Sequence, residues 1–120
     1  MAQDLRNRTK EFALRIIRLY SSLPSSSTVA QVIGKQILRS GTSVGAHYRE
    51  AYRSRSDAEF ISKIQGGLQE LEETVYWLEL LIESELVSET RLKNLLQECS
   101  ELTAIFIASV KKVKQRQSKT

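Results

Sequence analysis

The chain has 120 residues, of which 41% are hydrophobic and 27% are charged, and its formal net charge is +4. This length accommodates one domain with a single core, and the composition excludes both an intrinsically disordered chain and a membrane protein. Five glycines and one proline are too few for the frequent turns of a β-sandwich or barrel, so the expected fold class is all-α.

The sequence begins without the apolar core of a secretory signal, and no run of about 18 apolar residues could span a bilayer. We therefore expect a cytoplasmic protein with no membrane partner. Its one cysteine, Cys99, falls on the apolar pattern of its segment and is interpreted as a buried structural thiol.

Charge is distributed unevenly along the chain. Residues 1–56 contain ten Lys or Arg against three acidic residues, residues 57–110 contain three against eleven, and the last ten residues add five positive charges. This asymmetry favours a polyanionic partner, self-association of opposite faces, or both. Charged helix backs that only face water would produce the same asymmetry.

Four helical segments are predicted in chain order. The first covers about residues 4–22 and ends before Pro24, and the second covers about residues 28–53. The third, about 56–84, begins at a capping box in which Ser56 accepts from the amide of Glu59 and the Glu59 side chain reaches back. The fourth covers about 88–113, and we expect the polar tail 114–120 to fray.

Apolar residues recur at intervals of three and four in each segment, which places them on one helix face. Connections of a few residues between long helices make neighbouring helices antiparallel, so the prediction is an up-down-up-down four-helix bundle with one domain over residues 1–120. The positions expected to face its core include Ile16, Ile17, Val29, Ile37, Leu71, Leu78, Leu102 and Phe106.

Two features exceed what one core requires. Tyr76, Trp77 and Leu80 lie off the core-facing stripe of the third segment, and we assign them to a subunit interface. Gly34, Gly41 and Gly45 lie along one edge of the second segment, where each costs about 0.8–1 kcal/mol relative to alanine. Small residues on one line allow another helix to approach closely, and Gly41 and Gly45 are assigned to the interface too, although periodicity leaves open whether the crossing is within or between subunits.

The second segment also carries cations opposite its apolar face. Lys35, Arg39, Arg49 and Arg53 form one stripe about four turns long, Arg55 follows it, and Arg15 and Arg18 lie on the polar side of the first segment. Such spacing suits the phosphates of a nucleic acid, and these seven residues are the predicted nucleic-acid contacts. No base-reading motif accompanies them, so the expected binding is sequence-independent and salt-sensitive. A solvated helix back is the alternative interpretation.

No catalytic constellation is recognisable, and we expect neither enzyme activity nor a cofactor or metal. The only histidine, His47, is followed by Glu50, but a di-iron site in a bundle requires two Glu-x-x-His pairs and further carboxylates. His47 is therefore interpreted as a hydrogen-bonded histidine at the edge of the core. Serine and cysteine lack the further histidine that a nucleophilic triad would need.

Three segments resemble a known family. They are QILRSGTSVGAHYREA from Gln36 to Ala51, SDAEF from Ser56 to Phe60, and EETVYWL from Glu72 to Leu78. They are similar to the bacterial four-helix bundle family that includes the 23S rRNA intervening-sequence proteins and the accessory variability determinant of diversity-generating retroelements. The resemblance covers about residues 8–113. His47 departs from the family pattern, which usually has asparagine, and this leaves the role of that position open.

The resemblance implies a homopentameric ring of bundles with a basic surface around its centre. In the retroelement branch it implies a nucleic-acid-binding accessory that also docks on a reverse transcriptase. We therefore expect a non-catalytic, homo-oligomeric adaptor for RNA or DNA. The alternative is an intervening-sequence type of bundle that acts through protein contacts alone, in which the basic stripe pairs with the acidic third helix of a neighbour.

Overall fold

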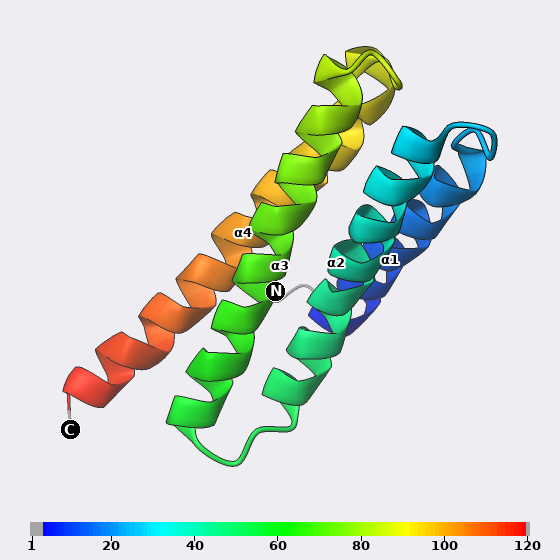
Figure 1. The fold of residues 1–120 in the computed structure, drawn as a ribbon. Coiled ribbons are helices and arrows are strands. Elements are labelled where there is room, and N and C mark those ends of the chain that lie inside the picture. Colours follow the sequence, from blue (N-terminus) through cyan, green and yellow to red (C-terminus); the bar gives the residue numbers. More distant parts are fainter. Residues whose placement is uncertain (1–3, 120) are drawn as a thin grey trace.

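The computed structural model describes residues 4–119 and contains four α-helices (Figure 1). They are α1 (Leu5–Ser22), α2 (Thr28–Tyr52), α3 (Asp57–Glu83) and α4 (Glu89–Ser118). Successive helices run in opposite directions and form an elongated bundle of 56 × 22 × 22 Å. The predicted all-α four-helix bundle is confirmed, with no strand between residues 4 and 119.

Each helix begins at a polar cap whose side chain accepts a hydrogen bond from the first turn. The caps are Asp4, Ser27, Ser56 and Ser88. Ser56 accepts from the Glu59 amide at 3.1 Å, as the capping box predicts. The Glu59 carboxylate accepts from the amide of Arg55 at 3.0 Å, one residue earlier than the motif requires. The start of α3 is therefore set by its own sequence.

The polar C-terminal segment is helical, whereas the sequence predicted that it would fray. Residues 114–118 were expected to fray but form the last turns of α4, while Thr120 lies outside the described residues. Lysine, arginine and glutamine have high helix propensity, and a cation in the last turn is favoured by the helix dipole. Arg116 also pairs with Asp57 of α3 at 3.1 Å.

The core lies on the axis of the bundle and is built from all four helices. Ile16, Val44, Leu71 and Phe106 are fully or almost fully buried and belong to one cluster. Two buried hydroxyls pair with each other: those of Ser40 and Thr74 lie 2.8 Å apart where α2 crosses α3.

Two predicted core positions face solvent instead. Ile17 is 42% exposed because a residue 100° beyond buried Ile16 falls past the edge of the contact face of α1. Val29 is 56% exposed and lies in the first turn of α2, where the end of the helix is little covered.

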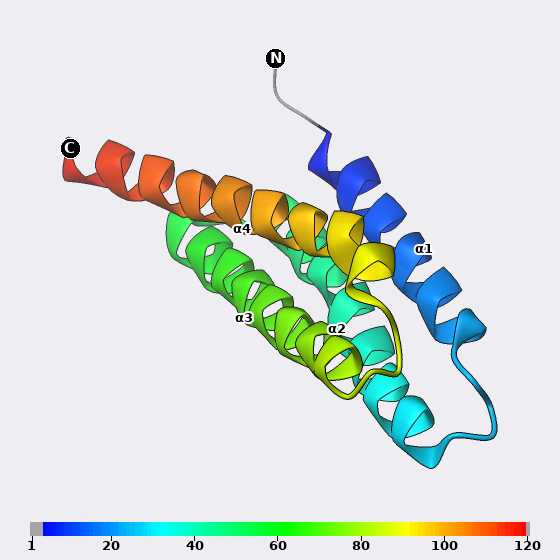
Figure 2. The ribbon, with the colours of Figure 1, turned by 90° about the horizontal axis from the view of Figure 1, so that it is seen from above.

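The closest packing in the bundle is between helices that follow one another in the chain. Seen from above, α4 crosses the bundle on the side away from α2 (Figure 2). Arg8 connects α1 to α4: its guanidinium donates to Glu98 at 2.8 and 2.9 Å and to Glu101 at 2.6 Å. Arg91 of α4 hydrogen-bonds to Ser22 at the end of α1.

Candidate nucleic-acid interface

The glycines of α2 face α1 of the same chain. A Cβ added to Gly41 would lie 2.6 Å from Ile16 Cγ1, and one added to Gly45 would lie 3.1 Å from Thr9 Oγ1. The close crossing that these glycines indicate is therefore internal to the bundle. This internal crossing accounts for both glycines, and their assignment to a subunit interface stays a prediction.

The surplus apolar residues of α3 are divided between core and surface. Trp77 and Leu80 are half-buried and pack against the core of their own chain, whereas Tyr76 is exposed. The Trp77 indole donates to Glu73 at 3.5 Å, and its ring meets Tyr76 edge-on with the centroids 5.0 Å apart. Tyr76 is thus the member of this predicted interface with the most surface available to a partner.

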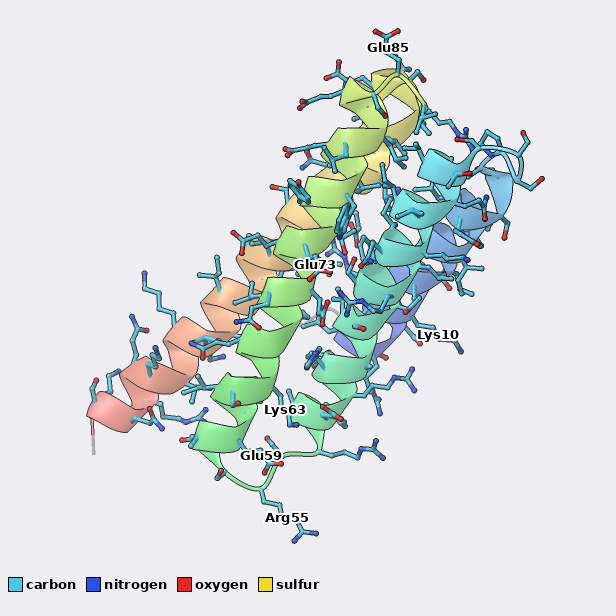
Figure 3. All side chains as sticks on the ribbon, in the orientation of Figure 1. Lys10, Arg55, Glu59, Lys63, Glu73 and Glu85 are labelled. Carbon is cyan, nitrogen blue, oxygen red and sulfur yellow. The ribbon has the colours of Figure 1, made fainter. Side chains whose placement is uncertain are left out.

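Arg39, in the middle of the predicted basic stripe, is oriented toward α3. Its guanidinium pairs with Glu73 and lies 3.8 Å from Glu70. Figure 3 shows Glu73 on the side of α3 that faces α2. Part of the acidic run of α3 is thus neutralised by Arg39 within the same chain, and Arg39 is less available to an external anion than its neighbours.

Arg49 and Arg53 lie on the other edge of the stripe, beside α1. There they line two adjoining hollows of about 280 and 170 Å³ between α1 and α2, which share Arg49. We call this feature the basic groove. Its lining residues are Arg6, Thr9, Lys10, Ala13, Thr42, Gly45, Ala46, Arg49, Tyr52 and Arg53.

The basic groove combines exposed cations with a floor of small side chains. Lys10, Arg49 and Arg53 are exposed and make no ion pair within residues 4–119. Arg6 lies 3.7 Å from Asp4 and stacks over the ring of Tyr52, 4.4 Å from its centroid. Uncompensated cations beside small residues allow an anion to approach the groove closely.

The remaining predicted contacts lie elsewhere. Lys35 is exposed toward the start of α2, and Arg55 points away from the bundle at the α2–α3 connection (Figure 3). Arg15 and Arg18 line a separate cleft of about 330 Å³ between α1 and α4, which Arg91 completes. The structure therefore divides the seven predicted residues among five places: Arg49 and Arg53 share the basic groove, Arg15 and Arg18 share the α1–α4 cleft, and the other three lie apart.

Sequence reasoning did not assign Arg6, Lys10, Tyr52 or Arg91 to a site. The signal for two of them was present, since Arg6 and Lys10 are four residues apart and share a helix face with each other. The position of this face of α1 beside Arg49 and Arg53 depends on how the two helices pack, which the sequence pattern does not give.

An apolar groove follows the outer side of α3 and α4. It consists of two hollows of about 500 and 400 Å³ that share Leu68 and Ile107, and Val75 and Val110 extend it. Ile107 is 53% exposed. Contiguous apolar surface of this kind marks contact sites in proteins.

His47 lies at the α2–α3 crossing, where its ring packs on Gly66. A Cβ at Gly66 would come within 2.7 Å of the ring. His47 Nε2 is 3.7 Å from Glu70 and Nδ1 has no hydrogen-bond partner, so the expected hydrogen-bonded histidine is wrong in that respect.

Among residues 4–119 no three His, Cys, Asp or Glu side chains gather as a metal site would require. None of the described helices is long and apolar enough to cross a membrane.

By its fold and its surface, the chain is a small all-α bundle with a basic groove on one pair of helices and an apolar groove on the other. The chain belongs to the 23S rRNA-intervening sequence protein family, whose model matches residues 2–108. This confirms the family resemblance.

A solved structure supports the same relationship. The chain is 40% identical to a protein of unknown function from the S23 ribosomal protein family of Bacteroides thetaiotaomicron. The match covers 88% of this chain and 97% of that chain, with a TM-score of 0.82. No curated protein is significantly similar to the chain.

Proposed function

We propose that this protein is a non-catalytic, homo-oligomeric adaptor that binds RNA or DNA through the basic groove, without sequence preference. The observation that carries the proposal is the convergence of Arg6, Lys10, Arg49 and Arg53 from two helices on one groove, three of them without an ion pair in the described chain. Neutralising phosphates with such side chains releases counterions, which is the main source of sequence-independent affinity.

The test is a titration of fluorescent RNA with the wild type and with Arg49→Glu/Arg53→Glu. The matched control is Lys93→Glu/Lys112→Glu, which makes the same change in net charge at two exposed lysines of α4. We expect at least a tenfold loss of affinity in the first variant and little change in the control. Equal affinity of the wild type and the Arg49/Arg53 variant, or absence of binding by the wild type, contradicts the proposal.

Salt provides a second measurement of the same contacts. On single-stranded nucleic acid the slope of log affinity against log salt changes by about 0.7 for each phosphate neutralised. Arg49→Gln and Arg53→Gln are each expected to lower the slope by about this amount. An unchanged slope would show that these side chains do not contact phosphate.

The homo-oligomer in this proposal is supported by surfaces that one bundle leaves uncovered, namely the apolar groove of α3 and α4 and the exposed ring of Tyr76. The family resemblance supports a pentameric ring. It also supports a reverse transcriptase as the protein partner, as for the retroelement accessory proteins. Copurification with a reverse transcriptase encoded beside this protein would test that partner, and failure to copurify from coexpressing cells would contradict it.

The alternative function is a protein-interaction module without a nucleic-acid ligand. It is favoured by the pairing of Arg39 with Glu73, which shows that cations of α2 can be satisfied by acidic residues of α3. If the remaining cations pair with a neighbouring subunit, rising salt will dissociate the oligomer and no RNA will bind. Light scattering across a salt series separates the two functions.

A further inference from the structure

Tyr52 is an uncharged aromatic residue among the cations of the basic groove, so attraction of phosphates does not explain its presence there. It is the last residue of α2 and is 56% exposed. The guanidinium of Arg6 covers one face of its ring. The centroid of Tyr48 lies 6.3 Å from that of Tyr52 and 6.0 Å from that of buried Phe106, so the exposed ring is connected to the core through aromatic contacts.

We propose that the basic groove selects single-stranded nucleic acid, with an unpaired base stacked on Tyr52 and adjacent phosphates on Arg49 and Arg53. This inference rests on the proposed function and names the class of nucleic acid. In a duplex the faces of the bases are covered by their neighbours, whereas every unpaired base presents a π-face that an aromatic side chain can stack on.

The position of Arg6 supports this assignment. Its planar guanidinium occupies the ring face of Tyr52 that a planar base would take. Both its contact to the ring and its pair with Asp4 are at the surface, where such interactions contribute little. A base can therefore displace Arg6 at low cost, and the released guanidinium then lies beside the phosphate of that nucleotide.

The shape of the groove supports a strand that continues past Tyr52. The two hollows join at Arg49, and the hollow farther from Tyr52 presents Lys10 above a floor that includes Gly45 and Ala46. Because the residues of this floor are small, a phosphodiester backbone can follow it between the cations of α1 and α2. The direction of the strand is thus along the seam between these helices.

The experiment compares two substitutions of one residue in the full chain. Fluorescence anisotropy would measure the affinity of a labelled single-stranded oligonucleotide of about 20 nucleotides, and of the same sequence as a duplex, for wild type, Tyr52→Phe and Tyr52→Leu. Circular dichroism and light scattering establish that the variants keep the fold and mass of the wild type. Leucine keeps an apolar side chain at the position but removes the ring.

We expect Tyr52→Leu to weaken single-strand binding about 5- to 150-fold, the effect of losing one stacked base, while Tyr52→Phe binds like the wild type and duplex affinity is the same for all three. Equal single-strand affinity of Tyr52→Leu and wild type, with the Arg49→Glu/Arg53→Glu variant impaired, overturns the stacking inference and leaves the proposed function standing. Loss of the duplex and single-strand complexes by the same factor also overturns it. No binding by the wild type rejects both.

Discussion

Gly41 illustrates how a single missing side chain determines the spacing of two helices. Ile16, the residue that an added Cβ would strike, is completely buried and has no free volume into which to move. Gly45 faces Thr9 at a longer distance, so the two glycines of one crossing should differ in their tolerance of alanine.

Gly41→Ala is expected to lower the free energy of unfolding by about 1–2 kcal/mol. Overpacking costs about 1–3 kcal/mol, and a contact of 2.6 Å with Ile16 places the cost in the upper part of that range, about 2–3 kcal/mol. The higher helix propensity of alanine offsets about 1 kcal/mol of it. Gly45→Ala, the matched comparison, should cost less, because a contact of 3.1 Å with Thr9 Oγ1 requires a shift of only a few tenths of an ångström and the helix propensity of alanine offsets about 1 kcal/mol. Urea denaturation followed by circular dichroism measures both, and a Gly41→Ala variant as stable as the wild type would contradict the internal crossing.

Cys99 is completely buried, and this burial raises the pKa of its thiol to about 12. A thiol with that pKa is almost entirely protonated at neutral pH, and only the thiolate reacts readily. We expect the folded protein to react with a thiol reagent such as Ellman's reagent only as fast as it unfolds, and at once in concentrated urea. Rapid labelling under native conditions would contradict this prediction.

At the scale of elements, polar side chains connect α1 to α4. Arg8 forms a two-bond pair with Glu98, both largely buried, and a further bond to Glu101. Hydrogen bonds from Gln97 and Arg8 lower the pKa of Glu101. The folded state therefore favours the ionised form of this carboxylate more than the unfolded state does.

The sign of the pH dependence follows from this lowered pKa. The stabilisation of the folded state by ionised Glu101 is complete above the pKa that this carboxyl has in the unfolded chain, about 4.3. It is lost as the pH falls through the lower pKa of Glu101 in the folded state. We expect Arg8→Gln to reduce stability by about 1–2 kcal/mol at neutral pH and to flatten the decline in the urea midpoint below about pH 5. The same acid dependence in both proteins would show that Arg8 does not act on these carboxylates.

The helices could be predicted from the sequence because their signals are local: polar caps, apolar periodicity and Pro24 after α1. The end of α4 could not, because Lys114 and Arg116 are polar but also favour a helix. The candidate site was only partly predictable. The period of α2 places Arg49 and Arg53 on one stripe, but their partners on α1 and the turn of Arg39 toward α3 depend on how the helices pack.

At the scale of the whole molecule, the two grooves lie on different helix pairs. The basic groove belongs to α1 and α2, and the apolar groove belongs to α3 and α4. A subunit that associates through the apolar groove would keep its basic groove open. Assembly and ligand binding can then be removed separately by substitution.

Ile107→Glu is expected to reduce the mass of the particle in light scattering, because it places a charge in the apolar groove at an exposed position. Ile17→Glu, at an exposed isoleucine of α1, is the matched control and should leave the mass unchanged. Identical masses for the wild type and Ile107→Glu would place the contact between subunits elsewhere, with Tyr76 the next residue to substitute.

Each helix packs mainly on the helix that precedes or follows it in the chain, so most native contacts form between segments close in sequence. Chains with this property fold in microseconds to milliseconds. The bonds of Arg8 to Glu98 join residues that are 90 apart in the sequence, so we expect them to form late in folding, after the rate-limiting step. Arg8→Gln should therefore accelerate unfolding and leave the folding rate unchanged in stopped-flow urea jumps.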